Sequence, residues 1–140
     1  MCEKYWFMFL GHLLGDYFFQ NNWMALNKKK PTSEGYYACL FHCFIYTVIV
    51  SLCLLITNYQ VSLVQFWLIF FSHWIFDRYE LIEKYANFVG IRIWNSKIDL
   101  NHLDVPFTKE ESIHLSFGVF VYIVMDNTAH LFLMTLIIMT

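Results

Sequence analysis

The chain has 140 residues, a net charge of −2 and the composition of a membrane protein. Hydrophobic residues make up 59% of it and charged residues only 14%, whereas a soluble domain is usually about half apolar and a quarter charged. The negative net charge and the lack of a basic stripe argue against nucleic acid as a partner. Three of the four cysteines lie in one apolar run, which argues against a disulfide framework.

Four segments are apolar and long enough to cross a bilayer, since a spanning helix needs about 20 such residues. They are 5–25, 36–57, 61–77 with a wetter extension to about 85, and 110–140. Thr32 offers N-cap chemistry just before the second segment. The sequence therefore predicts an all-α, polytopic membrane protein, a single domain over 1–140 with four transmembrane helices in an up-down bundle.

Lysine and arginine are concentrated in the first and third connections of this bundle. The first connection carries Lys28–Lys30, and the third, over 87–109 with its flanks, carries Arg78, Lys84, Arg92, Lys97 and Lys109. Because basic loops stay in the cytoplasm, we expect a multi-pass protein of the inner (cytoplasmic) membrane with both termini outside the cytoplasm. We interpret Lys28–Lys30 as a topology determinant that touches anionic lipid headgroups.

Histidine and aspartate recur within the apolar segments at helical spacing. The residues are His12 and Asp16, His42, His73 and Asp77, and Asp126 and His130. A carboxylate near the bilayer centre costs about 2.5–3.5 kcal/mol, so these groups should face protein, water or a metal. On one helix, His12, Asp16 and Gln20 would form a single polar stripe. The small-xxx-small pair Gly11 and Gly15 should let another helix approach beside that stripe.

These seven groups are the ligand types that suit a divalent metal, with zinc expected first and manganese or iron as alternatives. They could hold one metal with supporting carboxylates, or two metals that clamp a phosphate. Arg78 and Lys84 are the nearest cations for such a phosphate. Two other interpretations stay open, namely an internal hydrogen-bond lock of Asp–His pairs and a proton or ion path. Cys39 and Cys43 fit small core residues better than soft ligands.

The groups can meet only if they lie at a similar depth in the membrane. Their depth follows from their positions along the helices, because an α-helix rises about 1.5 Å per residue. Asp16, His42, His73 and Asp77 reach a similar level in the cytoplasmic half. If the last helix begins at Glu111, Asp126 and His130 come out deeper, and His114 is the shallow candidate on that helix. The depth register of the fourth helix is therefore left open.

Four motifs follow one another along the chain: GHLLGDYFFQNNWMALNKK, LFHCFIYT, FSHWIFDRY and DNTAHL. In residues, order and spacing they resemble a family of small bacterial and phage membrane proteins, catalogued as domain of unknown function 3307, over nearly the whole chain. That family commonly has Gln where this chain has Asn127. The family is distantly similar to inner-membrane metal-dependent hydrolases, and through them to zinc phospholipases C and single-strand nucleases. The resemblance implies a phosphoesterase-like site with His-xxx-Asp pairs holding zinc.

The expected function is a membrane-embedded, metal-dependent hydrolase that acts on a phosphoester at the cytoplasmic face. A phospholipid headgroup or a phosphorylated, nucleotide-like small molecule is the expected substrate class, and a homo-oligomer is left open. One alternative is a non-enzymatic phage or bacterial membrane effector whose His/Asp core only fixes the fold. A small channel or transporter component is the other.

The loop charges generate a topology prediction. A reporter fused after Thr140 should read as non-cytoplasmic, and one inserted in the Lys28–Lys30 connection should read as cytoplasmic, because basic loops are retained inside. Paired alkaline phosphatase and fluorescent-protein fusions measure this, and each serves as the control for the other. Opposite readings at both positions would overturn the orientation and the depth assignment with it.

Overall fold

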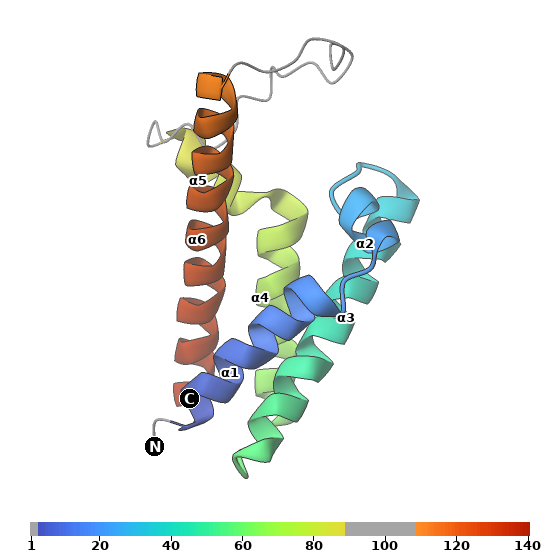
Figure 1. Ribbon diagram of the computed structural model, residues 1–140. Helices are drawn as coiled ribbons and strands as arrows, with labels where there is room; N and C mark the ends of the chain where they lie inside the picture. The colour runs from blue at the N-terminus through green and yellow to red at the C-terminus, as the bar shows by residue number, and fades with distance from the viewer. Residues whose placement is uncertain (1–2, 89–108) are drawn as a thin grey trace. The chain divides into compact units, whose positions relative to one another are not determined.

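The computed structural model describes residues 3–88 and 109–140, and every element in these ranges is a helix. In chain order the elements are α1 (Glu3–Leu13), the π-helix η1 (Leu14–Phe18), α2 (Asn22–Asn27), α3 (Ser33–Ile56), α4 (Leu63–Tyr79), α5 (Leu81–Phe88) and α6 (Lys109–Met139) (Figure 1). The predicted all-α class is therefore confirmed for these residues. The connection expected over 87–109 lies almost entirely outside them, as do Arg92 and Lys97, two of its predicted basic residues.

The chain divides into two compact units. The first is Met1–Glu80 with His130–Thr140, and the second is Leu81–Ala129, so α6 contributes to both. In the second unit, polar side chains of α6 bond back to its own backbone. Asn127 Nδ2 donates to the Ile123 carbonyl and Thr128 Oγ1 to the Val124 carbonyl, each at 2.6 Å. Bonds of this kind from a side chain to a backbone carbonyl are made within one helix.

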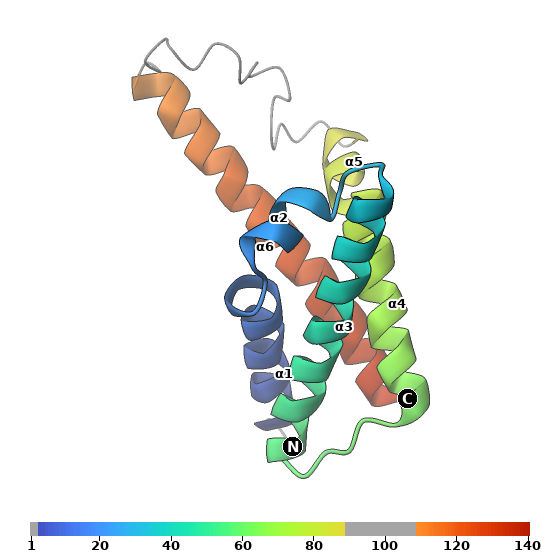
Figure 2. The ribbon, with the colours of Figure 1, turned by 90° about the vertical axis from the view of Figure 1, so that its right-hand side faces the viewer.

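α3 is the helix on which the first unit is built. Its N-terminus is capped as predicted, because the Thr32 hydroxyl accepts a hydrogen bond from Gly35 N at 3.1 Å. α1, α2 and α4 all contact α3, and α4 runs beside it in Figure 2. Tyr46, Val50 and Leu54 of α3 are fully buried. Their core also contains Met8, Ile69, Met134, Ile137 and Ile138.

The predicted first helix, over 5–25, is wrong in its second half. α1 gives way to the π-helix η1, and the chain then breaks before α2. The break arises because Asn21 caps a new helix, its side chain accepting from Met24 N at 2.9 Å. Gln20 lies in this break, so it does not continue a stripe with His12 and Asp16. The predicted extension of the third helix is also interrupted, at Glu80, which has a φ of 51°.

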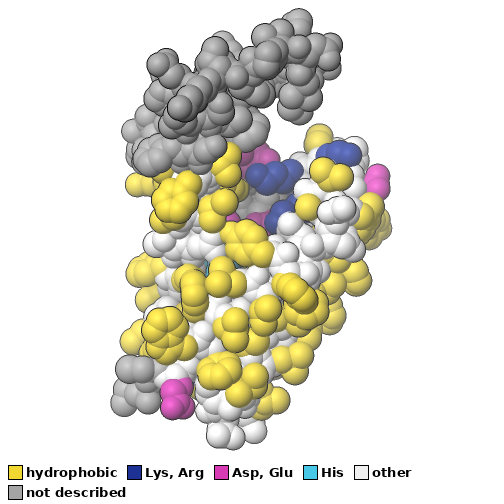
Figure 3. Space-filling view, in the orientation of Figure 1, with side chains coloured by type: hydrophobic (Ala, Val, Ile, Leu, Met, Phe, Trp, Pro, Cys, Tyr) yellow, Lys and Arg dark blue, Asp and Glu magenta, His cyan; other side chains and the backbone are white. Residues whose placement is uncertain are grey.

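Two described helices are long and apolar enough to cross a membrane, Ser33–Ile56 with 24 residues and Gly118–Met139 with 22. Spanning by 5–25 and 61–77 as well stays a prediction. Large apolar side chains are exposed over α1 and α3, as Figure 3 shows. Trp6, for example, is 71% exposed. Extended apolar surface of this kind is unusual in a soluble monomer.

α1 and η1 approach α3 closely at Gly11 and Gly15. A Cβ added at Gly11 would lie 2.9 Å from Val50 Cα, and one at Gly15 would lie 2.7 Å from Tyr46 Cδ2. Real Cβ atoms essentially never come so near another heavy atom. The predicted close approach of a second helix beside these glycines is therefore confirmed.

Replacing Gly11 by alanine should lower the free energy of unfolding by about 1–3 kcal/mol, the usual cost of overpacking. The added Cβ would meet a backbone atom of Val50, which can move only if α1 and α3 separate. The melting temperature in detergent measures this, and it should fall although alanine favours a helix by about 1 kcal/mol over glycine. Leu10→Ala, at an exposed neighbour, is the control and should melt near the wild type. An undiminished melting temperature for Gly11→Ala would show that the helices have room to part.

Candidate metal centre

Six of the seven predicted ligands belong to the first unit, and they come from different elements of it. Asp16 lies in η1, His42 in α3, and His73 and Asp77 in α4, while His12 lies in α1 and His130 at the start of the part of α6 that belongs to this unit. Asp126 belongs to the second unit. It is therefore not placed against the others.

Four of these residues form an inner set of donor atoms. His42 Nε2 lies 3.1 Å from His73 Nε2, and Asp16 Oδ1 lies 3.3 Å and 3.1 Å from these two nitrogens. Asp77 Oδ2 lies 3.2 Å from His42 Nε2 and 3.6 Å from His73 Nε2. The side chains are buried or nearly so, Asp16 and Asp77 being 11% and 9% exposed.

The spacing of the Asp16, His42 and His73 donors fits three positions of a tetrahedral metal site. Zinc binds nitrogen and oxygen at about 2.0–2.1 Å, so neighbouring donors around it lie about 3.3–3.4 Å apart. Asp16 Oδ1 supports the fit independently. This buried oxygen has no hydrogen-bond partner among the described residues, although two imidazole nitrogens lie 3.1 Å and 3.3 Å from it. Two imidazoles and two carboxylates are a ligand set that zinc, manganese and iron all accept.

The local structure positions Asp16 and His73. Asp16 sits in the π turn, which is closed by a hydrogen bond from Phe19 N to the Leu14 carbonyl at 2.9 Å. Such turns occur frequently at functional sites. The His73 ring stacks on the Tyr46 ring, with centroids 3.6 Å apart and planes 9° from parallel. The ring that fills the space against Gly15 thus also fixes an imidazole of the inner set.

His12 and His130 lie outside the inner set and contact its members. His130 Nδ1 lies 3.1 Å from His73 Nδ1, the nitrogen that His73 would not use for a metal. His12 Nδ1 lies 2.9 Å from the Tyr46 hydroxyl and 3.4 Å from Asp16 Oδ2. Contacts of this kind orient metal ligands and set imidazole tautomers. Sequence spacing could not separate these two histidines from the inner pair.

Lys28 is a site residue that the sequence alone does not identify. Its Nζ donates to Asp77 Oδ2 at 2.6 Å and lies 3.3 Å from His42 Nε2, and its side chain is only 14% exposed. Burial opposes the charge of Lys28, but the carboxylates of Asp77 and Asp16 outweigh it and raise the pKa of the ammonium. The only signal in the sequence is the lysine run, which by itself indicates a surface feature.

Arg78 and Lys84, the cations expected to meet a phosphate, have other surroundings. Arg78 Nη1 donates to the carbonyls of Lys28 at 3.0 Å and Lys30 at 2.8 Å, so the guanidinium holds the link between α2 and α3. Lys84 is exposed on α5 and belongs to the second unit. The arginine therefore supports the site through the backbone that carries Lys28.

Cys39 and Cys43 are buried and pack with Phe70, as expected for small core residues. Their Sγ atoms are 4.0 Å apart. Cys43 also forms, with His73 and Asp77, a second group whose donor atoms all lie within 4.8 Å of one another. A sulfur donor is thus within reach of the inner set, which makes the environment softer than the seven predicted ligands alone would.

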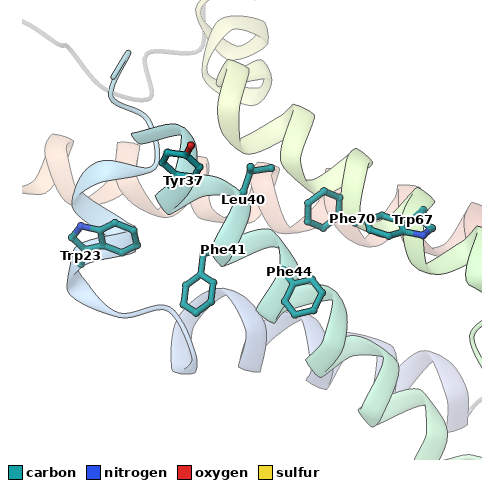
Figure 4. Close-up of a pocket in the computed structure, with 7 residues that line it drawn as sticks. All are labelled: Trp23, Tyr37, Leu40, Phe41, Phe44, Trp67 and Phe70. Carbon is teal, nitrogen blue, oxygen red and sulfur yellow. The ribbon is translucent and has the colours of Figure 1, made fainter. Parts of the chain in front are cut away.

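An open apolar groove of about 600 Å³ lies on the surface of the first unit. Figure 4 shows the side chains that line it, which come from α2, α3 and α4: Trp23, Tyr37, Leu40, Phe41, Phe44, Trp67 and Phe70. None of the inner donors is among them. The groove is therefore a feature separate from the candidate metal centre.

Comparison with known proteins gives one match. The model of a family described as protein of unknown function DUF3307 matches residues 5–140. No curated protein and no solved structure matches the chain. The resemblance inferred from the four motifs is therefore confirmed, and the more distant relationships to hydrolases stay an expectation.

Arg78→Met should expose the link between α2 and α3 to proteolysis, because two charge-assisted hydrogen bonds to its backbone are lost. Trypsin cleavage after Lys28 and Lys29 in detergent should become about tenfold faster or more, since a hydrogen bond to a charged group contributes about 1.5–3 kcal/mol. Mass spectrometry of the fragments measures the rate. Lys84→Met, at an exposed position, should leave it unchanged. Equal rates for both variants would mean that something other than Arg78 holds this link.

Proposed function

The chain belongs to the DUF3307 family, and we propose that it is a membrane protein that binds a divalent metal and hydrolyses a phosphoester at the cytoplasmic face. The observation that carries the proposal is the inner set, in which the His42 and His73 imidazoles lie 3.1 Å apart and each has an oxygen of Asp16 and an oxygen of Asp77 within 3.1–3.6 Å. Zinc is our first choice, because it accepts mixed nitrogen and oxygen ligands in a tetrahedron.

Each side chain has a role in this proposal. Asp16, His42, His73 and Asp77 would be the ligands, and a divalent metal held there supplies a Lewis acid and an activated water. His130 would hold the tautomer of His73 through its Nδ1, and His12 would hold Asp16. The Tyr46 ring, stacked on the His73 imidazole, fixes the orientation of the imidazole ring and excludes water from that face of it.

The membrane part of the proposal rests on the two long apolar helices and on the exposed apolar surface. Phe18 and Leu63 are 76% and 74% exposed, which would be unfavourable in water and favourable in lipid. A centre built between such helices would meet substrates at the bilayer surface. A phosphoester of a lipid headgroup or of a small phosphorylated molecule is therefore the proposed substrate class.

A second candidate is a membrane interaction protein in which the cluster only fixes the fold. The Lys28–Asp77 ion pair at 2.6 Å and the contact between His42 Nε2 and His73 Nε2 favour it, because they hold the inner residues together without a metal. Buried charges that are paired and hydrogen-bonded can specify a packing arrangement. The two candidates differ in what a chelator does.

Asp16→Asn and Asp77→Asn should each remove bound metal while the protein still inserts and folds. An amide keeps the shape of the carboxylate but loses the charge that a divalent cation needs. Elemental analysis of purified protein measures the metal, and hydrolysis of a chromogenic phosphodiester by zinc- or manganese-loaded protein measures the activity. Glu80→Gln, which removes a half-buried carboxylate that faces Lys29 outside the inner set, should retain both. Full metal content in both Asp variants would place any metal elsewhere.

Chelator should lower the melting temperature of the metal-loaded protein at neutral pH, and added zinc should restore it. A ligand at 100 times its dissociation constant stabilises the folded state by about 2.7 kcal/mol. A melting series in detergent with and without chelator measures the effect. If the protein as purified melts identically with chelator and with zinc, the interaction-protein candidate takes precedence.

A further inference from the structure

Lys28 is the ammonium closest to the inner donors among the described residues, and its neighbours in sequence point elsewhere. Lys29 Nζ lies 3.6 Å from Glu80 Oε1, and Lys30 Nζ donates to Asn27 Oδ1 at 2.7 Å. Only Lys28 of the three turns inward, to Asp77. Lysine is almost never buried unless its ammonium is paired, so the nearly buried Lys28 side chain is bound to this site through Asp77.

We propose that Lys28 holds the cation position of this centre in the metal-free protein, gives it up to the metal, and then binds the anionic group of the ligand. The inference rests on the proposed metal centre and adds a residue to it.

Competition follows from the atoms that Lys28 contacts. Its Nζ lies 2.6 Å from Asp77 Oδ2 and 3.3 Å from His42 Nε2, two donors that are themselves 3.2 Å apart and belong to the inner set. An imidazole nitrogen has one lone pair, so His42 Nε2 serves either the ammonium or a metal. Two cations sharing Asp77 Oδ2 in a buried site would also repel each other strongly. Metal binding must therefore move the ammonium.

The ammonium can move without leaving the site. Arg78 fixes the backbone carbonyl of Lys28, whereas the lysine stem has four flexible carbons. Displaced from Asp77, the ammonium would remain beside the centre as a mobile charge. Arg78 is bound to two carbonyls, so Lys28 is the available cation for a phosphate oxygen, which a lysine binds as a point charge.

The test compares Lys28→Met with Lys29→Met in detergent. Methionine keeps the length and apolar volume of the lysine stem and removes its charge. Zinc titration by calorimetry should show about tenfold tighter binding for Lys28→Met, within the range of coupling between residues in contact. Lys29→Met should bind zinc as the wild type does. In the zinc-loaded proteins, inorganic phosphate should bind about tenfold more weakly to Lys28→Met alone, because one charge-assisted contact is lost.

A measurement on the wild type guards against a variant that folds poorly. Amine-reactive labelling followed by mass spectrometry should modify Lys28 slowly without metal and faster with zinc, while Lys29 labels at one rate in both states. The paired and buried ammonium is protected only while it sits on Asp77.

The outcomes separate this inference from the metal centre. Zinc binding that is equal or weaker in Lys28→Met, with unchanged labelling of Lys28, would overturn the competition and leave the metal centre standing. Unchanged phosphate affinity would overturn the anion-binding role. Failure of every variant to bind zinc would reject the metal centre and this inference together. If Lys28→Met binds zinc and the wild type and Lys29→Met do not, the ammonium of Lys28 excludes the metal completely, which supports the competition.

Discussion

The first unit depends on compensating two carboxylates that it buries among apolar helices. An isolated charge there would cost several kcal/mol, yet Asp16 and Asp77 are only 11% and 9% exposed. Imidazoles from α3 and α4 and the ammonium of Lys28 surround them. The same contacts therefore hold the helices in place and define the chemistry of the site. Any change to one of these groups should be judged for its effect on folding before its effect on function.

Much of the site could be predicted from the sequence because burying a charge in an apolar segment is costly. That cost singles out Asp16 and Asp77 and, by helical spacing, their histidine neighbours. Helix α3 with its Thr32 cap and the close approach at Gly11 were predictable as well, since caps and small residues leave local signals. Spacing alone could not rank the candidate ligands, however, because His12 and His73 both lie four residues before an aspartate, yet only His73 belongs to the inner set.

The features that escaped prediction depend on tertiary context. A run of three lysines carries no information about where each side chain points, and only the folded link shows three different partners. Arg78 was expected to meet a ligand, but its position one residue after Asp77 carries it to the backbone of that link. The break before α2 did leave a signal, since Asn21 is a strong N-cap residue. The apolar residues on both sides of Asn21 nevertheless favoured the prediction of one continuous helix over 5–25.

The π-helix η1 has a consequence for how the GHLLGD motif should be compared between sequences. A π turn takes up one residue more than an α turn, so it rotates the residues after it by about 100° relative to an unbroken α-helix. That extra residue sets the phase between α1 and the segment that leads into α2. Deletion of either residue 14 or residue 15 would leave every candidate ligand present in the sequence, yet it would shift Asp16 by one helical position and turn its carboxylate away from His12 and α3. Conservation of length in this segment should therefore matter as much as conservation of its letters.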